Sequence, residues 1–96
     1  MSSFSFALPA DFADYESEVE VKGWFSGAAM IVSGTRYQLN FYDPVRLRQT
    51  IEEELENGSL FFEPNLVIVK SVTGSEMEQA VRQLAESDQV KFLVPD

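Results

Sequence analysis

The chain has 96 residues, 45% of them hydrophobic, which is the size and apolar content of one compact domain covering residues 1–96. It contains neither cysteine nor histidine, so disulfide bonds, thiolate nucleophiles, zinc–thiolate sites and histidine-based catalysis are excluded. Its 16 acidic and 7 basic residues give a net charge of −9, which repels a phosphate backbone and argues against direct binding of nucleic acid.

No part of the sequence indicates a membrane span or an export signal. Its apolar runs fall well short of the roughly 18 residues that a spanning helix needs. The first residues, MSSFSFALPADFADYES, lack the basic segment and the long apolar segment of a signal peptide. We therefore expect a cytoplasmic protein that does not contact a membrane.

The N-terminal segment predicts a short strand. In SFSFAL, Ser3–Leu8, a large apolar side chain recurs at every second residue, which is the period of a strand. The residues that follow, PADFADYESE, break this alternation and predict a turn or a single helical turn.

Residues 18–25, EVEVKGWF, predict the first strand of the main sheet. Val19, Val21 and Phe25 would face the core, while the charged residues and Trp24 would face outward. Two more strands are expected after this one. An apolar run, an SGT turn signal and a second alternation follow in order between residues 28 and 41. Together the three strands form an antiparallel meander.

The next segment carries strong helix signals. An aspartate and a proline at 43–44 favour a helix start, because the carboxylate can cap a free N–H and proline has no N–H to satisfy. Leu47, Ile51 and Leu55 recur at every fourth residue and form one apolar stripe. Asparagine and glycine at 57–58 favour a helix end.

The C-terminal part predicts strand, helix and strand. Residues 66–72, LVIVKSV, are apolar without alternation, as expected of a central strand covered on both faces. Thr73 and Glu76 form a capping box that starts the second helix. The buried stripe of that helix is expected to be Met77, Val81, Leu84 and Ala85. Residues 89–95, QVKFLVP, predict a last short strand.

The predicted fold is therefore α+β, a mixed α/β sandwich in which an N-terminal antiparallel meander of about three strands is followed by helix, strand, helix and strand. If the strands that flank each helix are parallel, right-handed crossovers place both helices on the same face of one mixed sheet. A three-layer arrangement is the alternative.

The charges of the first predicted helix run against its dipole. Two arginines lie near the positive end and four glutamates near the negative end: Arg46, Arg48, Glu52, Glu53, Glu54 and Glu56. Each misplaced charge costs only about 0.3–1 kcal/mol when exposed, so the fold tolerates them. One interpretation is that carboxylates elsewhere in the chain tether the arginines, the nearest in sequence being Asp43, Glu16, Glu18 and Glu20.

The other interpretation of these charges is functional. Glu52, Glu53 and Glu56 would form an acidic surface for a basic partner. Arg46 and Arg48 would engage an acidic group or a ligand anion at the helix N-terminus, where free N–H groups favour negative charge. Glutamate pairs on the helix would bind a hard cation only loosely, so no metal or other cofactor is expected.

Two aromatic residues are candidates for a contact surface. Trp24 and Tyr42 fall on the polar faces of their predicted strands. If these strands pair, the two side chains form an exposed patch that could anchor a partner. Alternatively, the N-terminal segment with Phe4 and Phe6 covers this face and buries both side chains.

Nothing in the sequence marks a catalytic site. Lys70 and Ser71 are adjacent in a predicted strand, so their side chains point to opposite faces and cannot form a dyad. The leading hypothesis is a non-catalytic protein-interaction or regulatory module that binds a basic protein or associates with itself. One alternative is a small anionic-ligand binder or weak enzyme that uses Arg46 and Arg48. Another is a nucleic-acid mimic that binds a basic protein through aligned acidic side chains.

Overall fold

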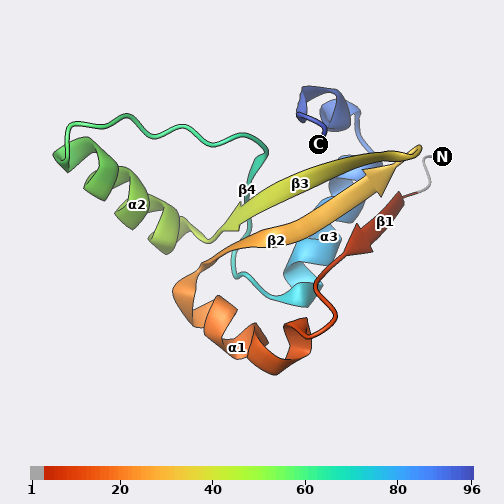
Figure 1. Cartoon of the computed structure of the whole chain (residues 1–96), viewed down its shortest axis with the longest axis horizontal. Coiled ribbons are helices and arrows are strands. Elements are labelled where there is room, and N and C mark those ends of the chain that lie inside the picture. The colour runs from red at the N-terminus through yellow and green to blue at the C-terminus, as the bar shows by residue number, and fades with distance from the viewer. Residues whose placement is uncertain (1–3) are drawn as a thin grey trace.

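The computed structural model describes residues 4–96 and contains, within them, one four-stranded mixed sheet, three α-helices and a 3-10 helix (Figure 1). The elements are β1 (Phe4–Ala7), α1 (Phe12–Lys22), β2 (Trp24–Val32), β3 (Thr35–Tyr42), α2 (Pro44–Glu56), β4 (Leu66–Ile68), α3 (Gly74–Ala85) and η1 (Asp88–Phe92). This architecture confirms the predicted α+β fold. β1 lies within the predicted N-terminal strand, whose first residue, Ser3, is outside the described part of the chain.

The strands lie in the order β1-β2-β3-β4. The first three are antiparallel neighbours, so the meander is present, although β1 replaces the strand expected at 18–25. β4 runs parallel to the end of β3, where Phe41 lies opposite Val67. A β-bulge keeps β2 continuous through Gly27, where a Cβ would come within 2.7 Å of the Phe25 ring.

One face of the sheet carries the core. It is formed by alternate residues of β2 and β3, and these strands pass in front of α3 in Figure 1. The buried cluster between the sheet, α1 and α3 includes Phe12, Val19, Met30, Leu39, Phe41, Met77 and Val81. α1 and α3 therefore cover one face of the sheet.

The strand predicted at 18–25 is wrong over residues 18–22, which form the end of a helix, whereas Trp24 and Phe25 begin β2. α1 extends to Lys22, well beyond the single helical turn that was expected. It is kinked at Tyr15, whose φ is −130° and ψ is 16°, buries Phe12 before the kink and Val19 after it, and leaves Val21 exposed. Gly23 then ends the helix with a φ of 74°, in the left-handed region that glycine favours.

The C-terminal strands also differ from the prediction. β4 has three residues and lies at the edge of the sheet, so the predicted central strand over 66–72 is wrong. Ile68 faces solvent at 53% exposure, while Val69 and Val72 enter the core after the strand has ended. Residues 89–92 form most of η1, and residues 93–95 belong to the tail that follows it, so no strand is present here.

α3 begins where the sequence predicts, but only one half of the capping box is present, because the backbone N of Thr73 donates to Ser71 O at 3.1 Å and not to the Glu76 side chain. Thr73 Oγ1 accepts a hydrogen bond from the backbone N of Glu76 at 3.2 Å, and the Glu76 carboxylate lies 3.5 Å from Lys70 Nζ. Met77, Val81 and Ala85 are buried against the sheet, with Leu84 partly buried beside them.

α2 does not cover the sheet. Figure 1 shows it extending away from the other elements, with residues 57–65 returning from its end to β4. None of its thirteen residues is buried. The prediction that both helices after the meander cover the same face is therefore wrong for α2. We call α2 and its return loop, residues 44–65, the arm.

Candidate interaction surface

The start and end of α2 are defined by local contacts. Asp43 Oδ1 accepts a hydrogen bond from the backbone N of Arg46 at 2.7 Å, and Pro44 occupies the first helical turn. Asn57 and Gly58, whose φ is 79°, end the helix. These contacts, predicted from the sequence, explain how the helix forms without a buried face.

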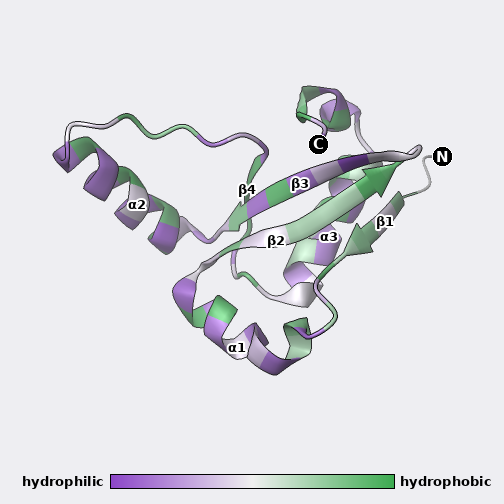
Figure 2. Cartoon of the chain, in the orientation of Figure 1, coloured by the Kyte–Doolittle hydropathy of each residue, from purple (hydrophilic) through white to green (hydrophobic). Residues whose placement is uncertain are grey.

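The apolar stripe of α2, formed by Leu47, Ile51 and Leu55, is only partly covered by the rest of the chain. Leu47 and Ile51 are partly exposed and Leu55 is 60% exposed. Figure 2 shows the resulting mixture of hydrophobic and hydrophilic segments along α2, apart from the sheet. The N-terminal half of the stripe and Ile68 of β4 border an open hollow of about 330 Å³. The end of the stripe at the root of the arm is thus partly exposed beside Ile68, and Leu55 at its far end faces solvent.

The charges of α2 are divided between the two sides of the helix. Arg48 and Glu52 line the hollow beside the stripe and form an exposed pair, with Arg48 Nε 3.2 Å from Glu52 Oε1. Glu53 and Glu56 are also exposed, but at 100° per residue they lie on the opposite side of the helix from Ile51. The predicted acidic surface is therefore not continuous with the stripe.

Arg46 lies at the root of the arm. It is half-buried, and its Nε, like Glu63 Oε1, is buried without a hydrogen-bond partner among the described residues. Its charge acts on the pKa of Tyr42, which it lowers. The proposed tether by Asp43, Glu16, Glu18 or Glu20 is not present among residues 4–96, where Arg46 forms no ion pair and Arg48 pairs with Glu52. The Glu16 carboxylate instead accepts a hydrogen bond from the backbone N of Gly74 at 2.8 Å. Arg46 and Arg48 therefore belong to different environments.

Trp24 and Tyr42 are paired across β2 and β3, with ring centroids 6.4 Å apart, but they do not form an exposed aromatic patch together. Trp24 is 36% exposed, whereas Tyr42 is only 4% exposed. The return loop of the arm contacts Tyr42: its hydroxyl donates a hydrogen bond to Glu63 Oε2 at 3.0 Å, and Phe61 packs edge-on at 6.2 Å. The covering segment is thus the loop and not the N-terminal strand.

This environment also changes the acidity of Tyr42. Burial, the hydrogen bond to Glu63 and the negative charge of Glu63 raise the pKa of Tyr42 to about 12, against the opposing effect of Arg46. The hydroxyl is therefore protonated at neutral pH and acts as a donor. Its contact attaches the return loop to the end of β3.

Sequence reasoning missed several residues of the arm and its surroundings. Glu63 and Phe61 contact Tyr42 from a loop that carries no regular pattern, and Ile68 was assigned to a covered strand. The only signal was the aromatic string LFFEP, residues 60–64, in which Phe61 is partly buried and Phe62 is exposed.

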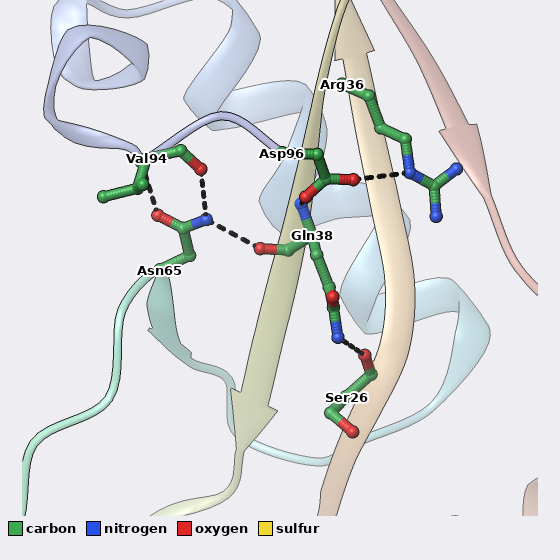
Figure 3. Close-up of polar contacts among 6 residues, drawn as sticks. All are labelled: Ser26, Arg36, Gln38, Asn65, Val94 and Asp96. Carbon is green, nitrogen blue, oxygen red and sulfur yellow. Dashed lines mark hydrogen bonds and ion pairs between the residues drawn. The ribbon is translucent and has the colours of Figure 1, made fainter.

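A second cluster of polar contacts attaches the C-terminal tail to the edge of β3 (Figure 3). The Asn65 side chain donates to Gln38 O at 2.7 Å and to Val94 O at 2.8 Å, and it accepts from Val94 N at 2.7 Å. Arg36 Nε pairs with Asp96 Oδ2 at 2.8 Å. All of these side chains have a partner within the chain, so the cluster stabilises the tail.

Two kinds of feature were not found among the described residues. Residues 4–96 contain no group of three or more acidic residues placed to hold a metal ion. Within the same range, no helix combines the length and the apolar character needed to cross a membrane. Comparison with protein-family models, with curated proteins and with solved structures found no match. The geometry of the arm is therefore the main guide to function.

Proposed function

We propose that this protein is a non-catalytic protein-interaction module and that the apolar stripe of α2 is its contact surface. The observation that supports this proposal is the lack of any buried residue in a thirteen-residue helix that carries Leu47, Ile51 and Leu55 on one side. Large apolar side chains gathered on one exposed face are typical of interaction sites.

The energetics favour association. An isolated helix of fewer than about 12–15 residues is marginal in water, so α2 depends on its caps and on the contacts at its root. Complete burial of a leucine or isoleucine side chain contributes roughly 1.5–3 kcal/mol. A partner that covers the exposed parts of the stripe would gain a fraction of this at each position, most of it at Leu55, and would stabilise the helix at the same time.

The surroundings of the helix N-terminus weigh against the anion-binding alternative. The carboxylate of Asp43 already accepts the hydrogen bond from the Arg46 N–H, so a ligand anion would have to displace it. The nucleic-acid mimic loses one of its premises, because Glu18 and Glu20 lie in α1 and not on a strand face. The interaction module remains the function that the arm supports best.

The proposal is tested by capturing bound protein from cells that produce a tagged and an untagged copy of the chain. We expect a bound protein, either the untagged copy or another chain, that is lost in the Ile51→Asp variant. Val21→Asp is the matched control, because Val21 is an exposed apolar residue on α1 and its change adds the same charge. Equal capture by the wild type and the Ile51→Asp variant, or no captured protein at all, would contradict the proposal.

A further inference from the structure

We infer that the occupant of the apolar stripe is a second copy of this chain, with the two α2 helices packed antiparallel around a two-fold axis near Ile51. The inference rests on the proposed function and names the partner. In such an isologous pair each surface meets its own copy, so one set of side chains must complement itself when the helix direction is reversed.

The stripe of α2 meets this condition. Leu47 and Leu55 are each four residues from Ile51, so the two-fold axis places Leu47 opposite the partner's Leu55 and the two Ile51 side chains opposite each other. The contact is then apolar along its whole centre. Thirteen residues correspond to a helix roughly 20 Å long, which allows about three turns of each copy to interdigitate.

The hollow at the root of the arm supplies the matching shape. Its lining includes Pro44, Leu47 and Ile68, at the N-terminal end of the stripe. In the antiparallel pair the C-terminal end of the partner helix lies here. The partner's Leu55, which is the most exposed side chain of the stripe, therefore enters the hollow, and the same contact recurs at the other end of the pair.

The reversed charges of α2 also fit this arrangement. Arg48 and Glu52 lie on the same flank of the stripe. Around an axis at Ile51, Arg48 lies opposite the partner's residue 54, so the partner's Glu52 on the same flank is displaced by two residues, about 3 Å along the helix axis. The two Glu52 side chains are equally close to each other, which leaves two attractive contacts against one repulsive contact. In a parallel pair this flank would instead face the opposite flank of the partner helix, so Arg48 would not meet the partner's Glu52. Opposite charges thus select the antiparallel orientation, and the two helix dipoles are also opposed.

A basic protein is a poorer match for the stripe. Arg48 flanks the hollow and repels positive charge, while Glu53 and Glu56 lie on the other side of the helix. The second copy brings both an acidic and a basic residue to the flank of the stripe. For this reason the self-complementary pair is the occupant that the charges favour.

The test uses two single charge reversals, Arg48→Glu and Glu52→Arg, studied separately and as an equimolar mixture. In each variant alone, like charges meet across the two-fold axis, so we expect the dissociation constant measured by sedimentation equilibrium to rise about tenfold or more relative to the wild type. In the mixture, the introduced glutamate meets the introduced arginine at one of the two contacts, and the native Glu52 of one chain meets the native Arg48 of the other at the second contact. Native mass spectrometry should therefore show mainly mixed dimers.

The control is a mixture of the Arg48→Glu and Glu53→Arg variants. It has the same net charges as the test mixture, but position 53 lies away from the stripe. We expect no excess of mixed dimers in this control. Circular dichroism of each variant verifies that α2 is still helical, and a glutamate at position 48 suits the dipole of an intact helix.

Three results would overturn the inference: a wild-type chain that is monomeric at several hundred micromolar, single variants that dimerise as strongly as the wild type, or a control mixture that forms mixed dimers as well as the test mixture does. The proposed function fails differently. If the wild type is monomeric but the Ile51→Asp change removes capture of another protein, the stripe is a contact surface whose occupant is not a second copy.

Discussion

Gly23 and Asp43 pack against each other at the root of the arm. The backbone N of Asp43 donates a hydrogen bond to Gly23 O at 2.9 Å, and a Cβ at position 23 would lie 2.5 Å from an Asp43 carboxylate oxygen. The same carboxylate caps α2 through the backbone N of Arg46. The end of α1 and the start of α2 therefore share one contact, which contributes to the direction in which the arm leaves the sheet.

This contact predicts the effect of a methyl group at position 23. Gly23→Ala should lower the free energy of unfolding by more than the roughly 1–2 kcal/mol of left-handed backbone strain, because the new Cβ also displaces Asp43. Gly34→Ala is the matched control, since Gly34 has a φ of 81° but no heavy atom within 4 Å of its would-be Cβ. Urea denaturation measures both, and equal losses would show that Asp43 does not make this contact.

The stripe of α2 and the core should respond differently to truncation. In dilute protein, Leu55→Ala should change the free energy of unfolding by no more than about 0.5 kcal/mol, because the side chain is 60% exposed. Met77→Ala, which empties a fully buried position on α3, should cost about 2–5 kcal/mol. Thermal and urea unfolding of both variants tests the difference. A large loss in the leucine variant would mean that the stripe is part of the core.

Tyr42 predicts a loss of stability at high pH. Its pKa rises from 10.0 to about 12 on folding, so the folded state holds the phenol proton more tightly than the unfolded state. The resulting stabilisation is complete below pH 10 and is lost as the pH rises through 12. Tyr42→Phe removes the donor to Glu63 and should cost about 1 kcal/mol at pH 7.

The comparison of these two proteins across pH isolates the tyrosine, because their other titrating groups are the same. Urea unfolding at pH 7 and at steps from pH 9 to 12 should show the advantage of the wild type shrinking above pH 10. A difference that stays constant over the whole range would contradict the role of Tyr42 as the donor to Glu63.

Asn65 holds the C-terminal tail through its side chain and adopts a left-handed φ of 54°. Asn65→Gly should lose the three amide contacts at a cost of about 1–2 kcal/mol but relieve the backbone strain. Asn65→Ala loses the contacts and keeps the strain, so it should be the less stable variant. Hydrogen exchange at Val94 N reports the release of the tail. Unchanged exchange in both variants would show that other contacts hold the tail.

Local signals account for the parts of the fold that were predicted well. The caps of α2 and α3 involve residues within three positions of each other, and the structure contains both capping contacts. The strand predicted at 18–25 failed because one buried residue, Val19, satisfies both an alternating pattern and a helix face. Tertiary packing against β2 decides between them, and a short alternating pattern does not contain that information.

The candidate surface depends on longer-range contacts. The stripes of α2 and α3 look alike in sequence, since each repeats an apolar residue at every fourth position, but only that of α3 meets the sheet. The alternating pattern of its strand predicts that Tyr42 faces outward, but in the structure Phe61 and Glu63 cover it. The pairing of Arg48 with Glu52 could be predicted from their spacing. The separate environment of Arg46 could not be predicted, because it depends on residues distant in the sequence.

The central claim is that the stripe of α2 is an intermolecular contact covered by a second copy. Hydrogen–deuterium exchange of the α2 amides, measured at low and high protein concentration with the α3 amides as reference, tests it most directly. We expect α2 to exchange much faster than α3 in dilute protein and to gain protection as the concentration rises, while the protection of α3 stays the same. Protection of α2 that equals that of α3 and does not depend on concentration would contradict the claim.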